Sequence, residues 1–112
     1  MELILKPWGS EEILAHTNQY VMKKMYIKPG QRMSLQYHQK KEETIFVVEG
    51  NLVVWNDSKS EPKIITPGGV YHVTPTTVHR FGATDSYGVT LIECSTTELD
   101  DVVRLEDDYS RD

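Results

Sequence analysis

The sequence has little of several features that would point to particular protein classes. It contains one cysteine, Cys94, in 112 residues, which excludes an intramolecular disulfide and a cysteine-rich zinc site. We expect this thiol to be buried in a strand, because it ends the mostly apolar run 89–94. No apolar run approaches the ~20 residues of a membrane-spanning helix, and the first residues lack a signal-peptide pattern. These absences predict a protein of the reducing cytoplasm with no membrane partner.

Charge is unevenly distributed, and the basic residues form no stripe. The net charge is −5. Residues 98–112 carry seven acidic and two basic residues, whereas the other residues carry ten of each. The excess negative charge therefore lies in an acidic C-terminal tail, which we expect to be solvated. The lack of a basic stripe interleaved with aromatic residues argues against a nucleic-acid partner.

The distribution of turn residues and β-branched residues predicts an all-β protein. Eight short strand-like runs lie between turn signals, at 20–27, 33–37, 44–48, 51–55, 63–65, 70–73, 79–82 and 89–94. Helical periodicity is nearly absent, and only residues 98–105 fit a turn or two of helix. No linker or repeat divides the chain, so we expect a single domain over 1–112. The pattern predicts a small antiparallel barrel or a double-sheet jelly roll.

One predicted strand has a polar face. Gln36 and His38 are two residues apart and project from the same side of a strand. Strict alternation places Ser34 and Arg32 on this side as well. Burying such groups unpaired costs on the order of 1–3 kcal/mol each, so we expect them to line a ligand-holding lumen. The alternate residues, such as Met33, would face outward and need cover from another layer or from a second subunit. We expect a homodimer.

A set of four side chains offers donors for one divalent metal. The set is Gln36, His38, Glu43 and His79. An amide oxygen, a carboxylate oxygen and two imidazole nitrogens can hold a metal and leave positions open for a substrate. The amide of Gln36 is the weakest of these metal ligands. If Gln36 does not bind the metal, its side chain could form a hydrogen bond to a substrate. Glu42 competes with Glu43, since adjacent strand residues cannot both face inward.

The spacing of these residues resembles that of the two motifs of the cupin superfamily. Residues 30–50 reproduce the spacing of the first motif, with Gln36 where most cupins have histidine. Residues 68–83 resemble the second motif, in which His79 is the ligand. The usual proline, glycine and asparagine of that motif are threonine, threonine and alanine here. The resemblance implies the double-stranded β-helix, or jelly-roll barrel, of cupins.

The glutamine narrows the resemblance to one branch of the superfamily. A Gln-x-His pair is similar to the zinc site of phosphomannose isomerases. Three segments resemble the cupin domain of the type II enzymes: KPWGSEEIL at 6–14, IKPGQRMSLQYH at 27–38 and DDVVRLEDDYSR at 100–111. In bifunctional relatives this domain follows a sugar-nucleotide pyrophosphorylase, for which 112 residues leave no room, so we expect a free-standing isomerase-type cupin with N-terminal strand structure in 1–27. The resemblance implies zinc, although manganese, iron, cobalt or nickel would also suit the donors.

The resemblance implies the interconversion of mannose 6-phosphate and fructose 6-phosphate through an enediolate. A metal with one carboxylate and three neutral donors keeps a formal charge of +1 and polarises the substrate oxygens. A general base must move the proton, and its candidates are His72 and an acidic lumen residue. The candidate cations for the substrate phosphate are Arg32, Lys40, Arg80 and Arg104. Arg104 is our first choice, because its segment resembles the C-terminal signature of the family.

Plainer interpretations stay open for several of these residues. His72 also fits an ordinary strand histidine, Lys40 a solvated turn lysine, and Arg104 a surface salt bridge. Two other functions compete with the isomerase. One is a non-enzymatic cupin that binds a sugar or sugar phosphate, and the other is an iron oxygenase of the superfamily. Gln36 argues against the oxygenase, because the first ligand there is usually histidine.

Overall fold

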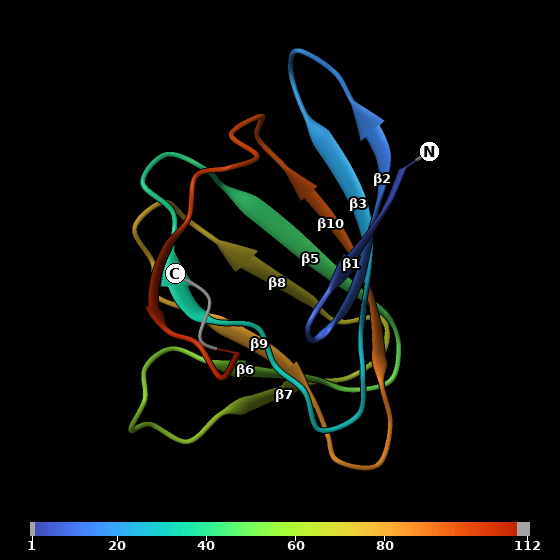
Figure 1. Cartoon of the computed structure of the whole chain (residues 1–112), viewed down its shortest axis with the longest axis vertical. Coiled ribbons are helices and arrows are strands. Elements are labelled where there is room, and N and C mark those ends of the chain that lie inside the picture. The colour runs from blue at the N-terminus through green and yellow to red at the C-terminus, as the bar shows by residue number, and fades with distance from the viewer. Residues whose placement is uncertain (1, 110–112) are drawn as a thin grey trace.

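The computed structural model describes residues 2–109, which form eleven strands (Figure 1). Residue 1 and residues 110–112, at the ends of the predicted domain and of its acidic tail, lie outside the described residues. The strands are β1 (Glu2–Lys6), β2 (Gly9–His16), β3 (Val21–Ile27), β4 (Leu35–Tyr37), β5 (Glu43–Glu49), β6 (Leu52–Trp55), β7 (Lys63–Ile65), β8 (Val70–Val73), β9 (Arg80–Ala83), β10 (Val89–Ser95) and β11 (Val103–Glu106). Within residues 2–109 no helix is long and apolar enough to cross a membrane.

The strands are arranged in three antiparallel sheets. The largest has the order β1-β2-β3-β10-β5-β8, the second has the order β7-β6-β9, and β11 pairs with β4. Neighbours that are distant in the chain, such as β3 and β10, show that the sheets are formed by long-range pairing. Figure 1 shows the β7-β6-β9 sheet lying across one end of the six-stranded sheet. The predicted all-β, antiparallel jelly-roll fold is confirmed.

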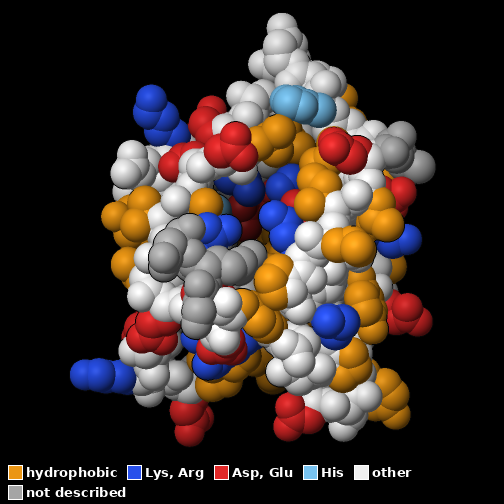
Figure 2. All heavy atoms as spheres, in the orientation of Figure 1, with side chains coloured by type: hydrophobic (Ala, Val, Ile, Leu, Met, Phe, Trp, Pro, Cys, Tyr) orange, Lys and Arg blue, Asp and Glu red, His pale blue; other side chains and the backbone are white. Residues whose placement is uncertain are grey.

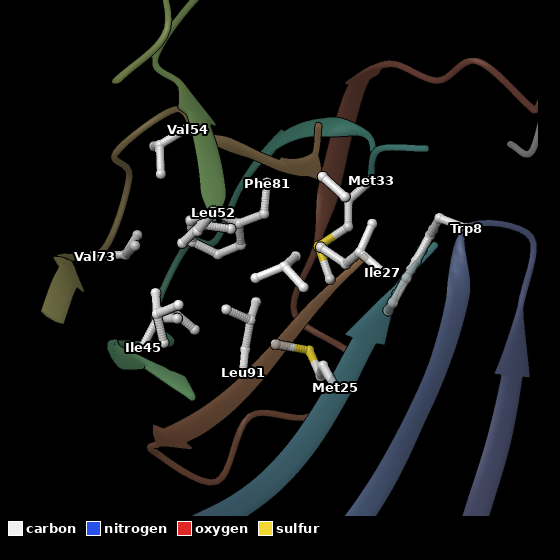
Figure 3. Packing of buried hydrophobic residues seen from close by; sticks show 13 residues of the cluster. Trp8, Met25, Ile27, Met33, Ile45, Leu52, Val54, Val73, Phe81 and Leu91 are labelled. Carbon is white, nitrogen blue, oxygen red and sulfur yellow. The ribbon is translucent and has the colours of Figure 1, made fainter. Parts of the chain in front are cut away.

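The core lies between these two larger sheets. Strand β3 alternates strictly between buried and exposed residues, which places Met25 and Ile27 inside. They meet Ile45 and Leu91 of the neighbouring strands and Phe81 of β9 (Figure 3). Each fully buried side chain of this size contributes about 1.5–3 kcal/mol to folding. The cluster extends to the wall of a cavity, which several of its members also line: Trp8, Met25, Met33 and Phe81.

The polar face predicted for the strand before the metal ligands is interrupted. Residues 33 and 34 lie outside any strand, between an isolated bridge at Arg32 and the start of β4. Strict alternation fails there, so Met33 is buried in the core and does not face outward as expected. Arg32 lies over the ring of Trp55 instead of in the lumen. Ser34 does share a side with Gln36, whose Oε1 accepts a hydrogen bond from Ser34 Oγ at 2.6 Å.

The C-terminal segment is part of the fold. The expected helical turn at 98–105 is wrong, because residues 103–106 form β11 and pair with the metal-ligand strand β4. The acidic residues described in 98–109 are not buried, in agreement with the expectation of a solvated tail, but two of them bind the rest of the chain. Asp108 accepts hydrogen bonds from Arg32 at 2.7 and 3.1 Å, and Asp101 accepts three from backbone N–H groups. These acidic side chains fasten the segment to the barrel.

The outer face of the six-stranded sheet is unusually apolar. Strands β3, β5 and β8 expose large apolar side chains, with exposed fractions between 38% and 59%: Met22, Tyr26, Phe46, Val48 and Val70. Cys94 joins them from β10, so the expectation of a buried thiol is wrong. Solvated faces of antiparallel sheets normally carry polar residues. An apolar face of this kind marks a site of interaction.

We propose that a second copy of the chain covers this face in a two-fold symmetric homodimer. The charged residues Glu12 and Lys24 stand opposite each other on the face, so their charges balance and do not repel an identical surface. We expect light scattering to give twice the chain mass of 12.9 kDa. Phe46→Glu should give monomers, because it places a charge in the apolar contact. Tyr87→Glu, at a more exposed loop position (74%), is the control. A monomeric wild type at micromolar concentration would contradict the proposal.

Candidate metal centre

Three of the four predicted ligands lie together inside the barrel. The donor atoms of His38, Glu43 and His79 are within 4.8 Å of one another, and all three side chains are buried. His38 directly follows β4, Glu43 is the first residue of β5, and His79 directly precedes β9. The cluster is thus formed by three strand ends that meet at one level of the barrel.

The two imidazole rings are held by backbone carbonyl groups. His38 Nδ1 donates to the carbonyl oxygen of Asp101 at 2.5 Å, and His79 Nδ1 donates to that of Thr77 at 2.9 Å. A carbonyl only accepts, so each Nδ1 carries the proton and each Nε2 keeps its lone pair. The Nε2 atoms lie 3.3 and 3.8 Å from the oxygens of Glu43. Hydrogen bonding by the remote nitrogen is the usual way to orient a metal-ligating histidine.

The donor set fits a divalent metal. His38 Nε2, Glu43 Oε2 and His79 Nε2 are buried, and none has a hydrogen-bond partner among residues 2–109. Glu43 Oε2 has an ion pair with Lys41 at 3.2 Å, but the two imidazole nitrogens have no donor within the described residues. An unpaired buried polar atom costs about 1–3 kcal/mol, so two at one point are expensive in an isolated protein core. Two imidazoles and a carboxylate are common ligands of zinc and related ions. One cation would satisfy all three atoms.

Gln36 lies next to this cluster. The backbones of Gln36 and His79 exchange two hydrogen bonds, at 2.9 and 3.0 Å. Gln36 also lines the adjoining cavity. The side-chain oxygen already accepts one hydrogen bond, from Ser34. An amide oxygen has two lone pairs, so one is left for a metal. The assignment of Gln36 as the fourth ligand stays a prediction.

Charges around the cluster keep the ligands in their metal-binding forms. Burial alone would raise the pKa of Glu43, but the neighbouring His38 and the charge of Lys41 lower it to about 2. Lys41 Nζ lies 3.2 Å from Glu43 and 3.1 Å from Glu93, and these carboxylates raise its pKa despite its burial. Burial lowers the pKa of His79. The result is an ionised carboxylate beside a neutral histidine, as metal binding requires.

A cavity of about 490 Å³ adjoins the cluster and contains several charged side chains. Figure 2 shows it as a hollow with lysine, arginine and acidic side chains at its base. Lys23 and Glu93 face it from adjacent strands, where they are direct cross-strand partners, and Lys23 forms a 3.2 Å ion pair with Glu11. Lys6 and Arg104 also line the cavity. Its size and its charged lining suit a small polar ligand.

The structure brings only one of the four predicted phosphate-binding cations to this cavity. Arg104 lines it from β11, opposite Gln36 in the strand register. Arg32 pairs with Asp108, and Arg80 donates to the carbonyl of Met33 at 2.8 Å, so both are engaged away from the cavity. Lys40 is exposed in the turn after β4. Three of the four predicted cations therefore do not reach the lumen.

His72, the predicted catalytic base, also does not reach the lumen. It lies on the outer face of β8, directly opposite Thr44 of β5, and it is about half exposed. Its Nε2 lies 2.7 Å from Glu42, and its Nδ1 lies 2.9 Å from Thr44 Oγ1. The reason is strand parity, because Thr44 and Glu43 point to opposite sides of β5. The same parity confirms that Glu43, and not Glu42, points inward.

The sequence analysis missed the charged residues of the lumen. Lys23 lies among the buried positions of β3, between Val21 and Met25, and Glu93 has the same relation to its neighbours in β10. A charged residue in the buried phase of a strand is the signal that would have found both. No comparable signal exists for Lys41, which precedes its strand, or for Asp101, which acts through its backbone carbonyl and through a turn.

Comparison with known proteins identifies the family. The family model described as "Mannose-6-phosphate isomerase C-terminal" matches residues 2–107. The chain belongs to this family. Its predicted resemblance to the C-terminal cupin domain of type II phosphomannose isomerases is thereby confirmed.

Curated relatives are much longer than this chain. The chain is 31% identical over 111 residues to the alginate biosynthesis protein AlgA of Pseudomonas aeruginosa, and 30% identical to the mannose-1-phosphate guanylyltransferase ManC of Salmonella typhimurium. Each match covers 96% of this chain but 23% of the relative. The chain thus spans about a quarter of the length of these proteins.

Solved structures with the same fold are cupins of low sequence identity. A cupin-like protein from Thermotoga maritima matches with a TM-score of 0.77 and 20% identity, covering 88% of this chain and 76% of that protein. A cupin-2 domain from Rhodospirillum rubrum matches with a TM-score of 0.80 and 13% identity, covering 93% and 74%. These matches show the cupin fold.

The ligand assignment predicts one divalent ion per chain. We expect His79→Ala and Gln36→Ala each to lower the metal content measured by elemental analysis after dialysis against zinc or manganese. Each change removes one donor from the set. His72→Ala is the matched control, because it removes a histidine from the outer face of the six-stranded sheet. Unchanged metal stoichiometry in both His79→Ala and Gln36→Ala would refute the assignment.

Proposed function

We propose that the chain is a metal-dependent sugar-phosphate isomerase that interconverts mannose 6-phosphate and fructose 6-phosphate. The observation that carries this proposal is the buried cluster of His38, Glu43 and His79, in which two imidazole nitrogens without hydrogen-bond partners among the described residues lie beside one carboxylate next to a charged cavity. Membership of the isomerase C-terminal family supports the choice of substrate. The cytoplasmic location stays a prediction.

A divalent metal, with zinc as the first choice, would be held by these three residues and Gln36. When bound, it supplies polarisation of the substrate carbonyl and of the neighbouring hydroxyl group. The chain's own task is then to hold the sugar phosphate in the cavity and to move one proton between adjacent carbon atoms. Both tasks fall to charged residues that line the cavity.

Glu93 is the proposed general base. It is buried in the wall of the cavity, beside Lys41 and directly opposite Lys23. Burial, followed by the negative charge of Glu43, raises the pKa of Glu93. A carboxylate whose pKa is shifted toward neutral pH is a more effective proton acceptor. In the reaction, one oxygen of Glu93 removes the proton from one substrate carbon and returns it to the adjacent carbon.

Lys6 and Arg104 are the proposed phosphate-binding residues. Four cationic side chains line the cavity: Lys6, Lys23, Lys41 and Arg104. Lys23 and Lys41 are already paired with carboxylates. Within the described residues Lys6 and Arg104 have no ion pair, so their charges are available to a phosphate group. They come from the first and last strands, β1 and β11.

The test of the isomerase activity is a coupled assay of the purified, metal-loaded chain with mannose 6-phosphate. We expect Glu93→Gln to lower kcat by ~10²–10⁴-fold while metal content is unchanged, because it removes the proton acceptor and no ligand. Glu49→Gln, an exposed carboxylate on β5, is the control and should keep wild-type activity. No turnover of any hexose or pentose phosphate by the wild type would remove the proposal.

The phosphate site predicts a separate effect on substrate affinity. Lys6→Ala and Arg104→Ala should each weaken the binding of mannose 6-phosphate, measured by calorimetry, by about tenfold, since a hydrogen bond to a charged group contributes roughly 1.5–3 kcal/mol. Binding of unphosphorylated mannose should not change. Lys24→Ala, on the outer face, is the control. Equal losses for both sugars would contradict a phosphate-specific role.

A non-enzymatic sugar-phosphate-binding cupin is the second candidate. The position of Glu93 beside two lysines favours it, because this arrangement also suits a structural ion pair. This function predicts that mannose 6-phosphate raises the melting temperature of the metal-loaded chain while no product forms. Formation of fructose 6-phosphate would instead show that the chain is an isomerase.

A further inference from the structure

We infer that Asp101 is a positioning residue for the metal centre, which holds His38 and the turn that leads to Glu43 in the geometry for metal binding. The inference rests on the metal site of the proposed function. It concerns a residue outside the donor set, in the segment between β10 and β11.

The side chain of Asp101 fixes the turn after His38. Its Oδ1 accepts a hydrogen bond from the backbone N–H of Gln39 at 3.0 Å, and its Oδ2 accepts from Lys40 at 2.7 Å and Lys41 at 2.9 Å. These three successive N–H groups lie between β4 and β5. They converge on one carboxylate, as in a backbone nest around an anion. The bonds, from Lys40 first, lower the pKa of Asp101.

The backbone of Asp101 fixes the imidazole ring itself. Its carbonyl oxygen accepts the hydrogen bond from His38 Nδ1. This contact sets the tautomer in which Nε2 is free to bind a metal, and it orients the ring toward Glu43. A single residue therefore controls both the ring of one ligand and the turn that connects it to the next ligand.

The strand pairing explains how Asp101 reaches this position. Strand β11 runs antiparallel to β4, with Val103 opposite Tyr37 and Arg104 opposite Gln36. Continuing this register toward the start of β11 brings Asp101 alongside His38 and the turn. The turn also positions Lys41, which lies between Glu43 and Glu93. Displacing Asp101 would therefore loosen the turn on which His38, Lys41 and Glu43 depend.

The test compares Asp101→Ala with Asp57→Ala. Asp57 is a matched control, because its carboxylate also accepts backbone hydrogen bonds, from Lys59 and Ser60, but in the loop between β6 and β7. We expect Asp101→Ala to raise the dissociation constant for Co²⁺ by ~10–100-fold, the usual effect of losing an outer partner of a metal ligand. The visible absorption of bound Co²⁺ should change as well. Asp57→Ala should leave both measurements at wild-type values.

Asp101→Asn provides a conservative variant. It keeps one side-chain oxygen as an acceptor, so we expect Co²⁺ affinity between those of wild type and Asp101→Ala. If Asp101→Ala does not fold, the inference is tested with Asp101→Asn and with the nitrogen NMR spectrum of His38 in the wild type. That spectrum should show the Nδ1-protonated tautomer in the metal-free chain, and the Nε2-protonated tautomer would overturn the inference.

The outcomes separate this inference from the function on which it rests. A wild type that binds no divalent ion would refute the metal site and the isomerase together. A wild type that binds Co²⁺ while Asp101→Ala binds it with the same affinity and spectrum would refute only the positioning role.

Discussion

The buried carboxylate of Glu43 is the interaction on which the rest of the site depends. Its two oxygens face two histidines and a lysine, and burial of such a group is tolerated only when positive or metal partners compensate for the lost solvation. The strands around it are arranged to supply these partners. His38 directly follows β4, the turn supplies Lys41, and His79 directly precedes β9. One inward-facing carboxylate thus determines which ends of three strands must meet.

The same sheet serves as an apolar core at one level and as a polar lumen at the next. Along β10, Leu91 faces the core, Glu93 faces the cavity, and Ser95 is opposite Glu43. Phe81 belongs to both levels, because it is part of the core and its ring centroid lies 5.2 Å from that of His79. Buried apolar contacts of this kind support a binding site, because they fix the strands that carry its polar residues.

Much of the fold and of the metal centre could be predicted from the sequence. All eight predicted strands exist, and parity together with motif spacing placed His38, Glu43 and His79 at one point. The pattern of strand-like runs did not locate β2, because its glutamate, leucine and alanine residues favour helices; only the family resemblance implied strand structure in 1–27. The pairing of β2 with β1 and β3 makes it a strand. His72 was misplaced because a histidine alone does not reveal the phase of its strand. The role of Asp101 depends on a pairing between distant segments, which local patterns do not encode.

The lumen wall contains a row of alternating charges, and this row limits which substitutions the site can accept. The row consists of Glu11, Lys23, Glu93, Lys41 and Glu43. Removing one member leaves a neighbour as an uncompensated buried charge, and breaking a buried pair costs about 3–5 kcal/mol. Replacing an acid and its adjacent base together avoids that cost. The row should therefore evolve by paired exchange, so that relatives with a different substrate lose or gain a lysine and a glutamate in the same step.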